Sequence, residues 1–89
     1  MRKLEREKSF IRDFHRVNLS DREFSNFIKY TSLLCEGKAL PKEAKDHALK
    51  GEWASFREFH IASDMLVIYK VYDESIKLIR LGTHAQLFA

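Results

Sequence analysis

Three histidines in the second half of the chain could support acid–base chemistry. His47 lies in a polar stretch, His60 ends an aromatic run, Asp64 follows it closely, and His84 lies near the C-terminal end of the sequence. Histidine gains or loses a proton near neutral pH, so several histidines beside an aspartate and basic residues indicate proton transfer on a charged substrate.

Each of these residues also has a purely structural interpretation. His47 could be a solvated loop side chain, His60 a half-buried hydrogen-bonded histidine, Asp64 a turn cap and His84 the start of a final helical turn. The same four side chains could bind zinc, but the close-spaced ligand pairs that are usual in zinc sites are missing. We therefore predict no metal and no other cofactor.

Length and composition predict one small folded domain over residues 1–89. The chain has 89 residues, of which 45% are hydrophobic and 12% aromatic, with three glycines and one proline. This composition argues against disorder, and the length is too short for two independent cores. A core of this size is only marginally stable, so a partner chain would help to stabilise it.

Charge and cysteine content narrow the possible partners and location. Sixteen basic and 13 acidic residues give a net charge of +3, spread along the chain, which is compatible with a polyanion or an acidic partner protein.

The single cysteine, Cys35, excludes an internal disulfide and is expected to be a small buried hydrophobic residue. No segment resembles a membrane span or a signal peptide. We expect a cytoplasmic protein that does not associate with membranes.

The first half of the chain predicts two antiparallel helices. Residues 2–7 could be an edge strand or a helical turn, and a helical period then runs from Ser9 to Val17. Ser20 and Glu23 have the spacing of a capping box, and apolar residues repeat from there to Gly37, which ends the second helix. The apolar face of this helix is too wide for a DNA-recognition helix, so both helices should cover a core.

The second half predicts a sheet. A polar connection over residues 38–51 carries His47 and Lys50, and three strand-like runs follow at 53–61, 65–72 and 75–81 with short polar breaks. These runs should form an antiparallel meander within a sheet of three to five strands. Two helices on one face of this sheet give an α+β two-layer sandwich. Strict alternation along the first run would place Arg57 and His60 on opposite faces.

Six blocks of residues resemble the YafQ-like branch of the RelE/ParE toxin superfamily. The blocks occur in the order of that branch, cover nearly all of residues 46–88, and are specific, whereas the first half matches only in its two-helix plan. They are Asp46-His47-Ala48-Leu49-Lys50-Gly51, Trp53, Phe56-Arg57-Glu58-Phe59-His60, Asp64, Leu66-Val67-Ile68-Tyr69 and Arg80-Leu81-Gly82-Thr83-His84-Ala85-Gln86-Leu87-Phe88. The resemblance implies a RelE-like microbial RNase fold.

The resemblance also implies an activity and its residues. Members are toxins of type II toxin–antitoxin systems that cut mRNA in the ribosomal A site without a metal, by attack of a 2′-hydroxyl on the adjacent phosphate. The functional histidines of the family fall on His47, His60 and His84, and its aspartate falls on Asp64. Its C-terminal phenylalanine matches Phe88, and basic positions that could hold phosphates match Lys50 and Arg57. We expect His84 as general acid, His47 or Asp64 as base, and His60 in a supporting role.

Two departures bear on activity. Met65 stands where this branch often has tryptophan, so base preference could differ, and Ala48 replaces a common proline in the loop that carries His47.

The expected partners are a neutralising antitoxin protein and mRNA on the ribosome, with DNA contacted only through the antitoxin.

Two other functions remain open at the level of sequence. A toxin of the same fold could be non-catalytic, either a gyrase inhibitor or a chain that only binds its antitoxin, but three histidines would then have no purpose. An unrelated RNA-binding domain is disfavoured because the sequence has no strong basic patch.

Overall fold

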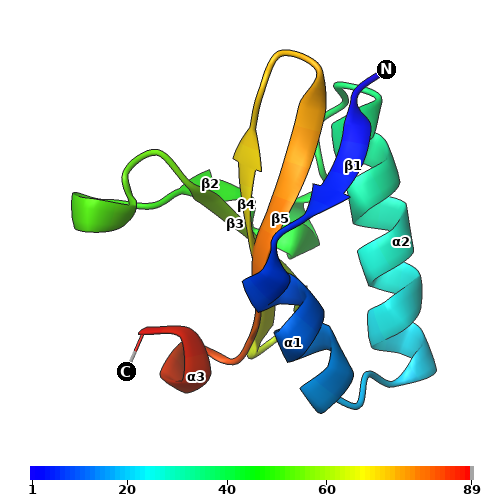
Figure 1. Cartoon of the computed structure of the whole chain (residues 1–89). Coiled ribbons are helices and arrows are strands. Elements are labelled where there is room, and N and C mark those ends of the chain that lie inside the picture. Colours follow the sequence, from blue (N-terminus) through cyan, green and yellow to red (C-terminus); the bar gives the residue numbers. More distant parts are fainter. Residues whose placement is uncertain (89) are drawn as a thin grey trace.

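Five strands form one mixed sheet in the order β1-β5-β4-β3-β2. The computed structural model describes residues 1–88. Figure 1 shows helices α1 and α2 on one side of this sheet and the short helix α3 near the C-terminal end of the chain. The strands are β1 (Lys3–Arg6), β2 (His47–Ala48), β3 (Arg57–Ala62), β4 (Met65–Val71) and β5 (Ser75–Gly82), and the helices are α1 (Lys8–Arg16), α2 (Asp21–Cys35) and α3 (His84–Phe88).

The local signals of α2 produce the predicted helix. Ser20 Oγ accepts a hydrogen bond from the Glu23 backbone N–H at 3.1 Å, and the Glu23 carboxylate accepts one from the Ser20 N–H at 2.8 Å. These reciprocal bonds satisfy two N–H groups that would otherwise be free at the start of the helix. At the other end Gly37 has a φ of +73°, which glycine adopts without steric cost. The predicted capping box and stop are both confirmed.

The meander of β3, β4 and β5 is antiparallel, as predicted, and the α+β class is confirmed. The N-terminal segment, which the sequence pattern left open between an edge strand and a helical turn, is strand β1. It pairs with β5 in parallel, so the sheet is mixed. The connection before β3 contains the two-residue strand β2, which the sequence pattern did not indicate. Two short 3-10 turns flank β2, namely η1 (Lys42–Ala44) and η2 (Gly51–Trp53).

Apolar side chains pack on both faces of the sheet, and β4 contributes to both layers. On the side of α1 and α2, Val67 and Tyr69 join the larger core. On the opposite side, Leu66 and Ile68 pack with Leu87 of α3. Burial of each such large side chain stabilises the fold by roughly 1.5–3 kcal/mol. The continuous apolar run of β4 therefore reflects a central strand that is covered on both faces.

A buried carboxylate fastens α1 to β5. Asp13 accepts hydrogen bonds from Arg80 Nε at 2.7 Å and from the Leu81 backbone N–H at 2.9 Å. Because β5 leads directly into α3, this contact also fixes the strand that precedes His84.

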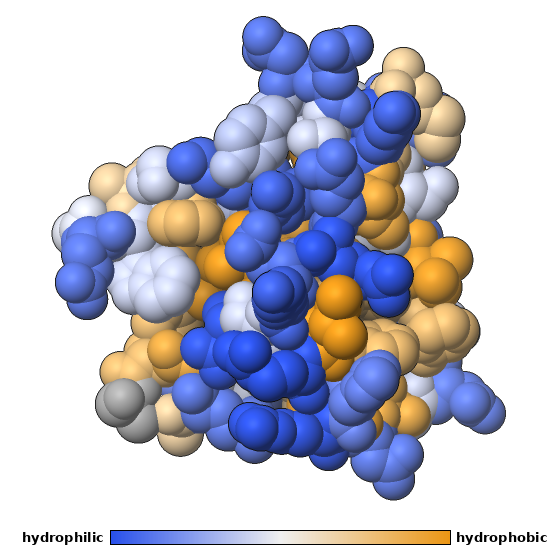
Figure 2. Space-filling view, in the orientation of Figure 1, coloured by the Kyte–Doolittle hydropathy of each residue, from blue (hydrophilic) through white to orange (hydrophobic). Residues whose placement is uncertain are grey.

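Cys35 is buried, as predicted, and burial raises the pKa of its thiol. Within residues 1–88, no helix has the length and apolar character needed to cross a membrane. Figure 2 shows hydrophilic side chains over much of one face of the molecule, with hydrophobic side chains between them.

Candidate active site

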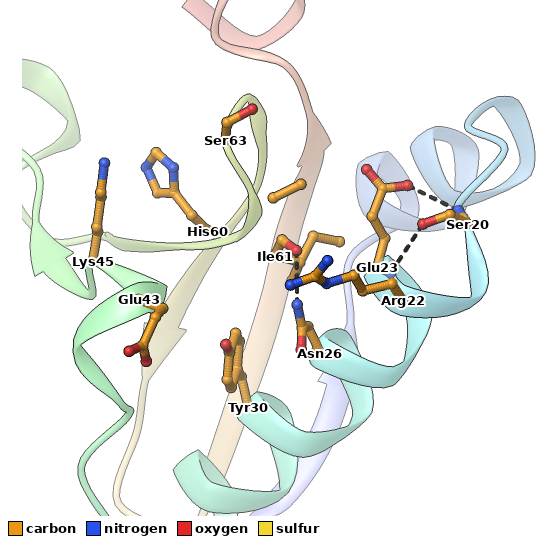
Figure 3. A pocket seen from close by; sticks show the side chains of 11 residues that line it. Ser20, Arg22, Glu23, Asn26, Tyr30, Glu43, Lys45, His60, Ile61 and Ser63 are labelled. Atoms are coloured by element: carbon orange, nitrogen blue, oxygen red, sulfur yellow. Dashed lines mark hydrogen bonds between the residues drawn. The ribbon is translucent and has the colours of Figure 1, made fainter.

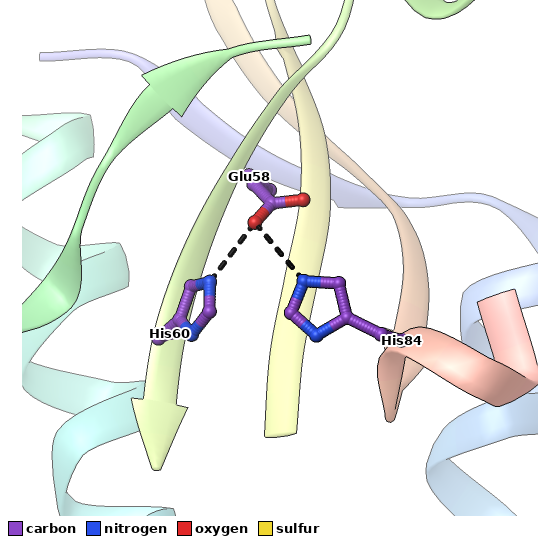
Figure 4. Close-up of side chains that lie close together, drawn as sticks. All are labelled: Glu58, His60 and His84. Atoms are coloured by element: carbon purple, nitrogen blue, oxygen red, sulfur yellow. Dashed lines mark hydrogen bonds and ion pairs between the residues drawn. The ribbon is translucent and has the colours of Figure 1, made fainter. Parts of the chain in front are cut away.

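Three histidines converge on one buried carboxylate. His60 Nε2 lies 2.9 Å from Glu58 Oε2, while Nε2 of His47 and Nε2 of His84 lie 3.6 and 3.7 Å from the same oxygen. Figure 4 shows His60 and His84 pointing toward Glu58 from β3 and α3. The Glu58 side chain is only 4% exposed, so its charge acts on the imidazoles with little screening by water. We call Glu58, His47, His60 and His84 the histidine cluster.

Strand geometry explains this convergence. Glu58 and His60 are two residues apart on β3, so both side chains project from the same face of the sheet. In the register of β2 with β3, His47 lies directly opposite Glu58. His84 is the first residue of α3, immediately beyond the end of β5. The cluster therefore needs β2 paired with β3, and β3 and β5 paired with β4 between them.

Asp64 orients His84. Its Oδ1 atom accepts the His84 backbone N–H at 3.1 Å and lies 3.0 Å from His84 Nδ1. A hydrogen bond at Nδ1 leaves Nε2 of the same imidazole directed toward Glu58. The hydrogen bond from the His84 backbone N–H, and then the hydrogen bond with the His84 imidazole, hold the pKa of Asp64 below its usual range.

This lowered pKa gives a prediction about stability and pH. The pKa of Asp64 is lower in the folded state than its ordinary value of 3.8, which applies to the unfolded state. The ionised carboxylate therefore stabilises the fold at pH values above 3.8, and this contribution is lost as the pH falls through the lowered pKa of the folded state. We expect Asp64→Asn to melt at a lower temperature than wild type at pH 7, with the difference disappearing only below pH 3.8. Thermal denaturation of both proteins across this range measures it, and a difference independent of pH would contradict it.

Solvent exposure divides the cluster into two pairs. The side chains of His47 and His84 are 54% and 50% exposed, so a substrate can reach them. His60 and Glu58 are 10% and 4% exposed and lie beneath them. His60 Nδ1 is buried and has no hydrogen-bond partner within residues 1–88. His47 and His84 are therefore placed to exchange protons with a substrate, while His60 and Glu58 support them.

The buried His60 also borders a groove beside the cluster. The groove has a volume of about 560 Å³ and runs between the first half of α2 and the end of β3. Figure 3 shows His60 and Lys45 on one wall, with Arg22, Asn26 and Tyr30 of α2 on the other. Its lining mixes acidic and basic side chains, and His60 is the only member of the histidine cluster that it includes.

Arg57 lies away from the histidines, as the alternation along β3 predicted. Its Nε donates to Asp46 Oδ1 at 3.3 Å and to the Tyr69 hydroxyl at 3.2 Å, and the Tyr69 hydroxyl itself donates to Asp46. Burial, and then the hydrogen bond to Asp46, raise the pKa of Tyr69. Because Asp46 directly precedes His47, this partly buried arrangement fixes the start of β2.

We expect Tyr69→Phe to weaken both the fold and the site. Loss of one buried hydrogen bond should reduce the free energy of unfolding by about 1–2 kcal/mol. The less constrained Asp46 would misplace His47 and slow catalysis roughly 3- to 10-fold. Urea denaturation and initial rates measure the two effects. Tyr72→Phe, at a tyrosine that is 42% exposed, is the control, and equal behaviour of the two variants would refute the positioning role.

The other predicted residues occupy separate positions. The Phe88 ring centroid lies 6.1 Å from that of His84, and the Phe88 side chain is partly exposed. Lys50 is exposed in the loop just before η2. Met65 packs against the helix-side core, and Ala48 is exposed in β2. Of the predicted catalytic residues, the structure thus brings together His47, His60, Asp64 and His84.

Glu58 is the site residue that the sequence analysis missed. The signal was a glutamate two residues before a histidine in a strand, which places both on one face. Ligand atoms of Glu58, His60 and His84 lie within 4.8 Å of one another, so these three residues could hold a metal ion. This trio differs from the zinc set that the sequence suggested, and the absence of a metal stays a prediction.

Comparisons with known proteins identify the family to which this chain belongs. Residues 2–89 match the family described as bacterial toxin of type II toxin–antitoxin system, YafQ. The mRNA interferase toxin YafQ of Escherichia coli K12 is 42% identical over 65 residues, which cover 71% of each chain. The chain therefore belongs to the YafQ family of type II toxin–antitoxin toxins, and the family resemblance is confirmed.

Solved structures extend this similarity over the whole chain. A copper-bound mutant toxin from Helicobacter pylori superposes with a TM-score of 0.87 and 38% identity, covering 99% of this chain and 100% of that one. The toxin in the E. coli DinJ–YafQ complex gives a TM-score of 0.85 and 30% identity, covering 100% of both chains. The first half of the chain, which showed only a two-helix plan in the sequence, thus shares the same fold.

Proposed function

We propose that this protein is an endoribonuclease that cleaves mRNA on the ribosome by histidine acid–base catalysis. The observation that carries the proposal is the pair of half-exposed imidazoles, His47 and His84, whose Nε2 atoms lie 3.6 and 3.7 Å from the buried Glu58 carboxylate. The E. coli relative is an mRNA interferase, which supports RNA as the substrate.

The two exposed histidines fit the two proton transfers of this reaction. In the proposed scheme neutral His47 accepts the proton of a 2′-hydroxyl, whose oxygen attacks the adjacent phosphorus. The bond from phosphorus to the 5′-oxygen breaks, and protonated His84 donates its proton to that oxygen. The products are a 2′,3′-cyclic phosphate and a 5′-hydroxyl.

The remaining residues stabilise this arrangement. Asp64 holds His84 Nδ1, and Glu58 lies 3.7 Å from Nε2 of the same imidazole, so both ring nitrogens face a carboxylate. His60 donates to Glu58 and keeps the carboxylate in place. Lys50 supplies positive charge for the phosphorane, and Arg57, of which 38% of the side chain is exposed, is a second candidate for contact with a phosphate.

Because histidines carry both proton transfers, we propose that the reaction is metal-independent. A related H. pylori toxin binds copper. In this chain a cation held by Glu58, His60 and His84 would engage the imidazole of the proposed acid and inhibit it. The rate should therefore be unchanged by a chelator.

We also propose that a cognate antitoxin neutralises the protein in the cytoplasm, as the E. coli DinJ–YafQ complex suggests. DNA would be contacted only through the antitoxin.

Expression of the wild-type protein in a bacterial host, with primer extension on a reporter mRNA, tests this function. We expect growth arrest and cuts in frame with the codons, which disappear when the start codon of the reporter is removed. Cuts in the untranslated reporter would refute ribosome dependence. Arrest without any cuts would refute the nuclease and indicate gyrase or another target.

A further inference from the structure

A continuous row of aromatic rings leads away from the histidine cluster. The His60 and His84 ring centroids are 5.4 Å apart, and the Phe88 ring lies 6.1 Å from His84. Trp53 follows at 5.8 Å from Phe88, and Phe56 at 5.4 Å from Trp53. We call Phe88, Trp53 and Phe56 the aromatic row. It brings together α3, η2 and the segment that enters β3.

Lysines lie at the far end of the aromatic row. Lys70 Nζ is 5.4 Å from the ring centroid of Phe56 and 5.4 Å from that of Tyr72, and Lys77 Nζ is 5.8 Å from Tyr72. The row thus has proposed proton donors and acceptors at one end and positive charge at the other.

This arrangement stays open to solvent. Trp53 and Phe56 are partly buried against Leu66 and Ile68, but Phe88 is 40% exposed and Tyr72 is 42% exposed. Phe88 at one end and Tyr72 beside the lysines are therefore accessible to a ligand. Gly51, with a φ of +66°, begins η2, the green turn that projects at the left of Figure 1 and carries Trp53.

Partly exposed aromatic rings interleaved with lysines are the features by which proteins hold single-stranded nucleic acid. Bases stack on the rings, and cations contact the phosphates. We propose that the aromatic row is a binding subsite for a nucleotide that flanks the cleaved phosphate, with Trp53 stacking on its base and Lys70 contacting its backbone. This inference rests on the proposed function and adds a residue, Trp53, that positions the RNA without taking part in proton transfer.

Fluorescence tests this subsite directly, because Trp53 is the only tryptophan in the chain. The probe is a short 2′-O-methyl RNA, which lacks the attacking hydroxyl and is not cleaved. We expect saturable quenching of Trp53 emission by this RNA and little change with an abasic strand of the same length, which has the phosphates but no bases. Equal quenching by both strands would overturn the stacking role.

Variants test the subsite in the reaction. On ribosome-bound mRNA we expect Trp53→Ala to raise the toxin concentration for half-maximal cleavage about 10-fold, with the rate at saturation within about 2-fold of wild type. Trp53→Phe, which keeps an aromatic ring, should recover most of the loss. Phe24→Ala on α2, at a phenylalanine that is 45% exposed, is the matched control. Lys70→Ala should weaken binding, unlike Lys29→Ala on the exposed side of α2.

The outcomes separate the subsite from the proposed function. Cleavage by wild type, together with an unchanged half-maximal concentration in a folded Trp53→Ala variant, would overturn the subsite and leave the nuclease intact. Quenching by RNA but not by the abasic strand, in a protein that cuts no mRNA, would support the subsite and refute the nuclease. Quenching by a purified antitoxin but by no RNA would assign this surface to the antitoxin instead.

Discussion

Replacing His84 with alanine is expected to slow mRNA cleavage by about 10²–10⁴-fold, the usual contribution of a general acid. The variant removes the only imidazole that contacts both Asp64 and the Glu58 carboxylate. Because half of the His84 side chain is exposed, its loss should leave the core intact. Rates of cleavage on programmed ribosomes, with circular dichroism to confirm the fold, measure this effect.

His15→Ala is the matched control, since His15 is an exposed histidine on α1, away from the cluster. We expect it to cleave at the wild-type rate. Cleavage by His84→Ala at a rate near that of the control would contradict the role of His84 as acid and with it the proposed mechanism.

Replacing Glu58 with glutamine should have the second largest effect. The amide keeps the shape of the side chain but removes the negative charge on which three imidazoles converge. We expect cleavage to slow about 10- to 100-fold, because the charged acceptor that holds His60 and faces His47 and His84 is replaced by a neutral amide.

Glu58→Ala extends this test to stability. It removes the partner of a buried histidine, so we expect a lower melting temperature as well as lower activity. Glu5→Gln, at an exposed glutamate of β1, is the control for the charge change. A Glu58→Gln variant that cleaves at the wild-type rate would show that the charge of Glu58 has no part in the reaction.

The elements that were predicted correctly depend on contacts close in sequence. The capping box joins Ser20 to Glu23, and the antiparallel meander joins strands through short turns, so both are visible in the residue pattern. Strand β2 could not be predicted, because two residues in a polar loop become a strand only when β3 supplies the partner. The parallel pairing of β1 with β5 was hidden for the same reason.

The site was predictable in part. The number of histidines beside acidic and basic residues, together with the family resemblance, indicated His47, His60 and His84. Glu58 was hidden because a glutamate between Arg57 and Phe59 resembles an ordinary exposed strand residue. Its burial follows from the pairing of β2 and the position of α3, which no local pattern encodes.

The pairing of β1 with β5 also bears on how the toxin is made. Lys3 pairs with Ser75, so β1 has no partner strand until β5 has been synthesised. His84, the proposed acid, follows β5 in the chain. A nascent chain that lacks β5 and α3 therefore has neither a complete sheet nor the residue that would complete the reaction. On the proposed mechanism, such a nascent chain would not cleave the message from which it is being translated.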